Sequence, residues 1–274
     1  MDLEREDYQE PRCPFETDQW QQEAPVYAID INRAIKKLDD CYSRDDLAGA
    51  ERVAYFWLAE AREGNDLRGE FAVRNELMGI YRKLGMKDYA IDNAQAALDL
   101  VKKLGIEGSV SEGTALVNAA TVYNAFGMPE KSIGLFERAK AVYEAELTVD
   151  WRLGGLYNNM ALTLAELGRY EEAEEIFEKA LEVMHKIECS QAEQAVTWLN
   201  LADLAAMRMG LEQAEAEIDK CCGQAVDLLD AESLPRDGNY AFYCEKCAPV
   251  FEYYGYFLVA EILKNRAKEI YERP

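Results

Sequence analysis

A pattern of large and small residues recurs through this chain about every 41 residues. One slot of the pattern holds Arg74, Leu116, Tyr157, Trp198 and Cys244, which are 42, 41, 41 and 46 residues apart. A second slot holds small residues, at Ala90, Ser132, Ala173, Ala214 and Ala260. Small residues facing large ones let two antiparallel helices approach closely, so each unit is predicted to be a helical hairpin. Because one hairpin cannot bury both of its faces, the hairpins are expected to stack into a solenoid.

The composition favours helix over strand. The chain has 274 residues, of which 49% are hydrophobic and only seven are proline. We therefore predict an all-α protein in which residues 27–272 form a single solenoid domain. Residues 1–26 contain Pro11, Pro14 and Pro25 and many acids, and they are expected to form a flexible acidic N-terminal arm. The solenoid is predicted to hold about six hairpins, near residues 27–63, 67–104, 110–147, 150–186, 190–230 and 238–272.

The hairpin around "YNNMALTLAELGRYEEAEEIF" resembles the tetratricopeptide repeat (TPR) family. The hallmark of that family is matched here by Tyr157, Met160, Ala161, Gly168, Tyr170, Ala173, Phe177 and Ala180. The period of 41 to 42 residues is longer than the usual 34, which is similar to the repeats of kinesin light chains and of bacterial peptide-sensing regulators. The resemblance covers most of residues 27–272 and is strongest from 113 to 222. It implies a right-handed superhelical solenoid.

In a solenoid of this kind the first helix of each hairpin is expected to line the concave side. Asn118, Asn159 and Asn200 are 41 residues apart and place one amide at the same position of three successive hairpins. A carboxamide both donates and accepts, so such a ladder can hold a peptide backbone, although it can equally bond to a neighbouring helix. The resemblance implies a peptide-binding groove. The predicted peptide-binding residues are Asn75, Arg82, Asn118, Thr121, Asn124, Asn158, Asn159, Asn200 and Asp203.

The charge of the chain limits the classes of partner that it is expected to bind. The formal net charge is −22, which repels nucleic acid and anionic lipid, so neither nucleic acid nor membrane is expected as a partner. The start, "MDLEREDYQE", lacks the features of a signal peptide, and the seven cysteines are an odd number. A cytoplasmic protein is the resulting expectation.

No enzyme or cofactor motif was found in the sequence. His185 is the only histidine, and there is no glycine-rich phosphate loop, nucleophile elbow or metalloprotease motif. We therefore expect neither catalysis nor a cofactor. Cys221, Cys222, Cys244 and Cys247 could together bind zinc, but most of these positions hold core residues in sister units, which favours packing. Pro249 leaves open that Cys244 and Cys247 lie on a turn.

The sequence thus predicts a non-enzymatic scaffold or adaptor that captures an extended peptide segment of a protein partner. Two alternatives stay open. One is a zinc- or thiol-based sensor that uses the four cysteines. The other is a structural homo-oligomerisation module, suggested by the aromatic-rich stretch "VFEYYGYFLVAEIL".

Overall fold

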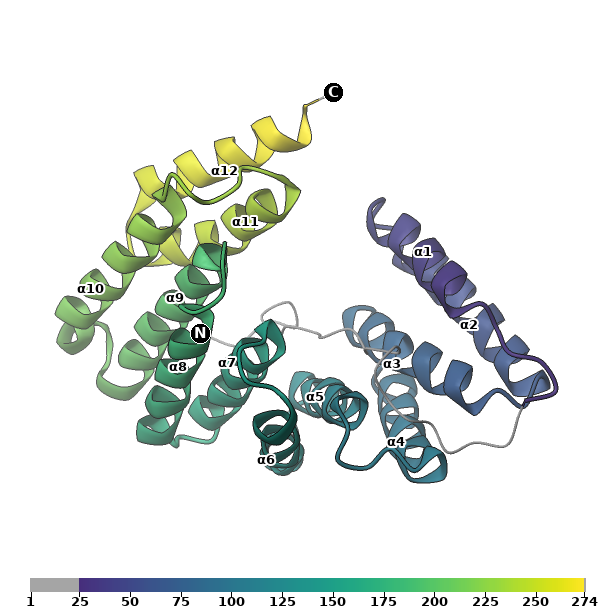
Figure 1. Cartoon of the computed structure of the whole chain (residues 1–274). Coiled ribbons are helices and arrows are strands. Elements are labelled where there is room, and N and C mark those ends of the chain that lie inside the picture. The colour runs from purple at the N-terminus through teal and green to yellow at the C-terminus, as the bar shows by residue number, and fades with distance from the viewer. Residues whose placement is uncertain (1–24, 274) are drawn as a thin grey trace. The chain divides into compact units, whose positions relative to one another are not determined.

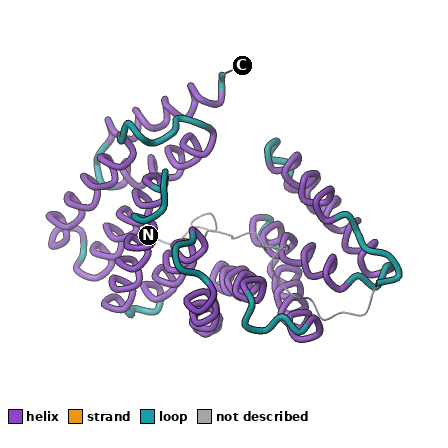
Figure 2. Tube along the Cα trace, in the orientation of Figure 1, coloured by secondary structure: helices purple, strands orange, loops and turns teal. Residues whose placement is uncertain are grey.

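The computed structural model describes residues 25–273, and every regular element in that range is an α-helix (Figures 1 and 2). The twelve helices found there pair into six antiparallel hairpins joined by short loops, which confirms the predicted fold class. The predicted arm of residues 1–26 lies outside the described range apart from its last two residues. No helix among the described residues is both long and apolar enough to cross a membrane.

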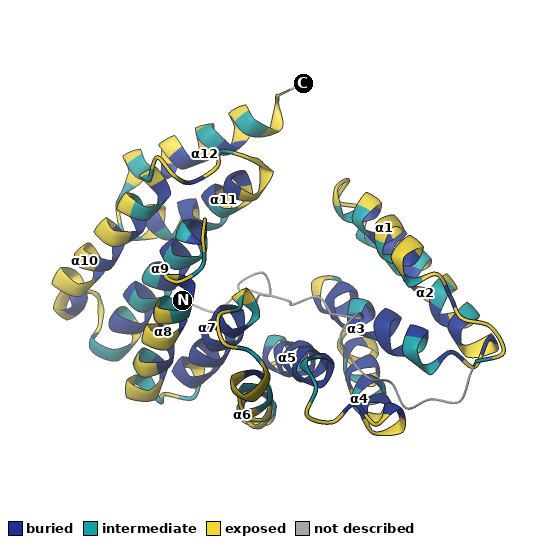
Figure 3. Cartoon of the chain, in the orientation of Figure 1, coloured by how far each residue is buried: buried dark blue, intermediate teal, exposed yellow. Residues whose placement is uncertain are grey.

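Residues 25–148 form one compact unit of three hairpins, here called the N-terminal unit. In this unit α3 packs against α2, α4 and α5, and α5 packs against α4 and α6. The helices α3 and α5 are buried along most of their length, whereas α4 and α6 keep an exposed side (Figure 3). The helices are α1 (Ile31–Tyr42), α2 (Leu47–Glu63), α3 (Leu67–Lys83), α4 (Lys87–Leu104), α5 (Val110–Ala125) and α6 (Pro129–Glu146).

Residues 149–273 form a second unit of three hairpins, here called the C-terminal unit. Its helix α9 packs against α7, α8, α10 and α11, and α11 packs against α12. The single solenoid predicted for residues 27–272 stays a prediction across the boundary between the two units. The helices are α7 (Trp151–Glu166), α8 (Tyr170–Met184), α9 (Gln191–Met209), α10 (Leu211–Asp230), α11 (Gly238–Tyr253) and α12 (Phe257–Tyr271).

The first helix begins later than the sequence predicted. We expected it to start at residue 27, but α1 begins at Ile31 because the side chain of Asp30 accepts a hydrogen bond from the Arg33 backbone N–H and caps the helix there. The preceding residues are tied to the end of the same hairpin instead, since the backbone N–H of Val26 donates to the carbonyl oxygen of Gly64, the C-cap residue of α2.

The small-residue slot lies in the core, as predicted. Its five members, Ala90, Ser132, Ala173, Ala214 and Ala260, are all buried, with at most 1% of any of them exposed. The turn glycines Gly85, Gly127, Gly168 and Gly255 all have φ between 71° and 84°, the left-handed region that favours glycine. The recurring pattern therefore specifies both the seam between paired helices and the turn that joins them.

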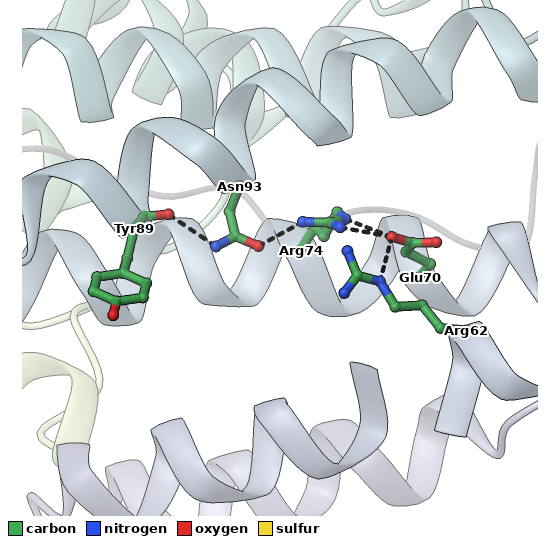
Figure 4. A network of polar contacts seen from close by, with 5 residues as sticks. All are labelled: Arg62, Glu70, Arg74, Tyr89 and Asn93. Carbon is green, nitrogen blue, oxygen red and sulfur yellow. Dashed lines mark hydrogen bonds and ion pairs between the residues drawn. The ribbon is translucent and has the colours of Figure 1, made fainter. Parts of the chain in front are cut away.

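One large slot of the repeat is filled by a charged residue. Arg74 of α3 is 7% exposed and stands where the later hairpins have Leu116 or Cys244. Its Nε and Nη2 donate to Oε1 of Glu70, at 2.8 and 2.7 Å, and its Nη1 donates to Oδ1 of Asn93 on α4 (Figure 4). Oε1 of Glu70 also accepts from Arg62 Nε of α2 (Figure 4). The buried guanidinium is thus neutralised by a carboxylate, and the network joins α2, α3 and α4.

The four cysteines of the zinc alternative are packed into the core. Pro249 lies inside α11 rather than at its end, so Cys244 and Cys247 lie on a helix and not on a turn. Burial raises the pKa of the Cys221 thiol to about 11 and of the Cys222 and Cys247 thiols to about 12, and it raises the pKa of Cys244 as well. These thiols are therefore protonated at neutral pH, unlike the thiolate of a redox-active cysteine.

Candidate binding face

In the N-terminal unit the predicted amides face one another across two hairpins. Asn118 of α5 donates from Nδ2 to Oδ1 of Asn75 on α3, at 3.3 Å, and Asn75 donates in turn to the Phe71 carbonyl oxygen of its own helix. Both side chains are buried, with 5% of Asn75 and 6% of Asn118 exposed. Oδ1 of Asn118 is buried as well, and it has no hydrogen-bond partner among the residues that the structure describes.

The C-terminal unit repeats this pairing. Asn200 of α9 donates from Nδ2 to Oδ1 of Asn158 on α7, at 3.4 Å. Asn158 is 2% exposed, and it donates to the Gly154 carbonyl oxygen and to Oγ1 of Thr197 on α9. Thr197 was not singled out in the sequence, where a threonine on a helix carries no signal of its own.

The two pairs assign different roles to the predicted asparagines. Asn75 and Asn158 come one residue before the position that Asn118 and Asn200 occupy in their own units. Each accepts a hydrogen bond from the next hairpin, so both hold neighbouring hairpins together. Asn118 and Asn200 donate to that earlier hairpin through Nδ2, and these two hydrogen bonds do not involve their carbonyl oxygens. The amides of Asn75 and Asn158 are thus used within the fold, whereas the carbonyl oxygen of Asn118 has no donor among residues 25–273.

The other predicted site residues are nearly all inaccessible. Thr121 is fully buried, and its hydroxyl donates to the Val117 carbonyl oxygen of its own helix. Arg82 is 1% exposed, Asn124 is 4% exposed, and Asn159 has no exposed surface. Asp203 of α9 is 9% exposed, and its Oδ1 accepts from the Tyr254 hydroxyl of α11 at 2.6 Å.

A further carboxylate on α9 was not predicted from the sequence. Oε1 of Glu193 accepts from the Tyr243 hydroxyl of α11 at 3.1 Å, whereas Oε2 is buried and has no hydrogen-bond partner within residues 25–273. Burial raises the pKa of the Glu193 carboxyl group above its usual range, although the hydrogen bonds from its own backbone and from Tyr243 oppose this. Burial also raises the pKa of Tyr243, and the nearby Glu193 raises it further. No pattern in the sequence pairs these two residues, which are 50 positions apart.

Within the described residues, no group of three or more His, Cys, Asp or Glu side chains is arranged to hold a metal ion. His185 lies at the C-cap of α8, where a helix end favours a partly positive side chain. The polar groups of the candidate binding face are therefore amides, hydroxyls and carboxylates along the first helices of the hairpins.

The model of the family described as "Tetratricopeptide repeat" matches residues 152–222, which comprise α7, α8, α9 and the first half of α10. Residues 152–222 are therefore similar in sequence to tetratricopeptide repeats. They coincide with the part of the chain where the sequence shows the TPR hallmark most fully, and the remaining hairpins are TPR-like in fold. None of the curated protein sequences matches the chain significantly.

Solved TPR structures share this fold at low sequence identity. The apo form of RapI has a TM-score of 0.60 and 14% identity, and the match covers 89% of this chain and 98% of RapI. The kinesin light chain TPR-like repeats of Podosopora anserina have a TM-score of 0.50 and 17% identity, with 73% of this chain and 96% of that chain covered. A Rap protein complexed with Competence and Sporulation Factor has a TM-score of 0.55 and 15% identity, with 90% of this chain and 66% of that chain covered. Identities this low support the fold alone.

Proposed function

We propose that this TPR-like chain is a non-enzymatic adaptor that binds an extended peptide segment of a protein partner along the first helices of its hairpins. Stacked helical hairpins are a scaffold widely used for protein–protein interaction. One of the structurally similar proteins, a Rap protein, was solved in complex with Competence and Sporulation Factor.

The observation that carries this proposal is the unused carbonyl oxygen of Asn118. The amide is more than nine-tenths buried, its Nδ2 is bonded to Asn75, and its Oδ1 has no partner among the described residues. A buried acceptor without a donor costs free energy, so few are kept in native proteins without a reason. The N–H of an extended peptide backbone is a donor of the right kind, and a backbone offers one at every second residue on each side.

Replacing Asn118 and Asn200 together by alanine tests the proposal. Peptides are first selected on the wild-type chain from a random twelve-residue phage-displayed library, and their affinities are measured by fluorescence anisotropy. Since each lost amide hydrogen bond contributes about 1 kcal/mol, we expect the double variant to bind at least roughly tenfold more weakly. Asn265→Ala, which removes an exposed amide of α12, is the matched control and should bind like the wild type.

Circular dichroism shows whether the double variant keeps its helices, which separates a loss of binding from a loss of fold. Unchanged affinity in a folded double variant would contradict the proposal, as would a library that yields no peptide specific for the wild-type chain. The homo-oligomer alternative stays a prediction. It is favoured by the apolar side chains Phe257 and Leu258 at the start of α12, which are 66% and 70% exposed.

A further inference from the structure

The carboxylate of Glu193 lacks a counter-charge. Oε1 receives one side-chain hydrogen bond, from Tyr243, and Oε2 has no hydrogen-bond partner in the described range, although it is buried. None of the ion pairs found among the described residues includes Glu193. Arg208, the one basic residue of α9, pairs with Glu174 and Glu217 instead.

A carboxylate with a buried oxygen that accepts no hydrogen bond is unusual in a folded chain. Removing an ionised group from water is costly unless a cation or several donors compensate for it, and here one tyrosine hydroxyl is the only side-chain donor. A second acceptor in the first turn of α9, Oε1 of Gln191, is also buried without a partner in the described range. The start of α9 therefore has two buried acceptor oxygens and no donor for either.

Glu193 lies on the side of α9 that belongs to the proposed binding face. It precedes Asn200 by seven residues, two helical turns, and Asp203 follows Asn200 by three residues, so the three side chains share one face of the helix. The hydroxyls of Tyr243 and Tyr254, from α11, bond to Glu193 and Asp203 respectively. These hydrogen bonds hold the carboxylates of Glu193 and Asp203, which lie on either side of the Asn200 amide along the helix.

We propose that this face of α9 recognises a basic side chain, lysine or arginine, of the bound peptide, and that Glu193 is the residue that pairs with it. The inference rests on the proposed function, because it names the kind of side chain that the proposed peptide carries. An ammonium or guanidinium group donates to a carboxylate oxygen and supplies the missing positive charge. A guanidinium, with five N–H donors, can also reach more than one acceptor.

The test compares peptides selected on the wild-type chain with their charge-neutral versions. The phage library is panned on the full chain, and the selected peptides are expected to share a lysine or arginine at one position. Replacing that residue by methionine should weaken binding to the wild-type chain by at least tenfold. The same replacement should change the affinity for Glu193→Gln by less than twofold, because glutamine keeps the acceptor for Tyr243 and removes the charge.

Glu215→Gln is the matched control, since it removes an exposed carboxylate of the neighbouring helix α10, and it should respond to the methionine replacement like the wild type. Selected peptides without a shared basic residue would overturn this inference while leaving the proposed function standing. So would a tenfold loss that persists in Glu193→Gln. If no peptide is selected at all, the proposed function fails and the inference fails with it.

Discussion

At the scale of single residues, the chain shows two ways of burying a charge. Arg74 occupies a core slot, but Glu70 and Asn93 compensate its guanidinium, so the slot keeps its packing role. Glu193 receives one side-chain hydrogen bond and no counter-ion within residues 25–273. The first arrangement stabilises the fold, and the second leaves a carboxylate to which a ligand can supply the missing positive charge.

Glu193→Gln should therefore stabilise the chain near neutral pH. Removing an uncompensated buried charge is expected to raise the free energy of unfolding by about 1 kcal/mol, or the Tm by about 2–4 °C. Because the pKa of Glu193 is raised in the folded state, the wild-type carboxyl group takes up a proton more readily there than in the unfolded chain. The advantage of the variant should thus be largest near pH 7 and shrink as the pH falls toward the ordinary value of 4.5.

Thermal melts at several pH values check this, with Glu215→Gln expected to match the wild type throughout. A lower Tm for Glu193→Gln at pH 7 would show that the carboxylate contributes to stability, contrary to this account. Higher stability together with the loss of preference for a basic side chain is the combination expected when a binding group is kept at the expense of stability.

At the scale of the helical hairpin, the fold depends on close approach between the two helices. In the hairpin of α5 and α6, a Cβ added at Gly113 would lie 2.3 Å from Cε1 of Tyr143. The Tyr143 ring is fully buried, and its hydroxyl is hydrogen-bonded to Thr114 Oγ1 at 2.8 Å, so it cannot move aside. The two helices of the α7 and α8 hairpin approach in the same way, since a Cβ added at Gly154 would lie 2.7 Å from Cε of Met184.

Gly113→Ala is accordingly expected to lower the free energy of unfolding by about 1–3 kcal/mol, because the added methyl group overpacks the seam. Gly134→Ala is the matched control: this glycine also lies inside a helix of the same hairpin, but nothing lies within 4 Å of an added Cβ. Alanine there should raise stability by about 0.5–1 kcal/mol through its better helix propensity. Urea unfolding followed by circular dichroism measures both, and equal effects of the two substitutions would contradict the packing argument.

At the scale of the whole molecule, each unit has a core of its own. Buried hydrophobic residues between Ile29 and Val122 form one continuous cluster, and those between Ala192 and Ala267 form another. Three stacked hairpins are about the smallest number that buries a continuous core in a repeat protein.

A fragment of residues 149–274 is therefore expected to fold alone, with a helical circular dichroism spectrum and a cooperative thermal transition. A shorter fragment of residues 190–274 lacks α7 and α8 and so uncovers the faces of α9 that they contact, and it should melt at a markedly lower temperature or not fold. If the longer fragment is unfolded, the C-terminal unit is not an independent folding unit.

The sequence by itself determined the period of the repeat, the pairing of helices into hairpins and the core positions of the small residues. These features follow from local spacing, which a helix converts directly into a face. It also located the asparagines, but not their partners. Only the tertiary structure decided that Asn75 and Asn158 bond to the next hairpin, that Glu70 and Asn93 accept hydrogen bonds from Arg74, and that Tyr243 donates one to Glu193. Glu70 lies one turn before Arg74 on the same helix, but each of the other contacts joins side chains from different helices. The helix period does not encode which side chains meet across helices.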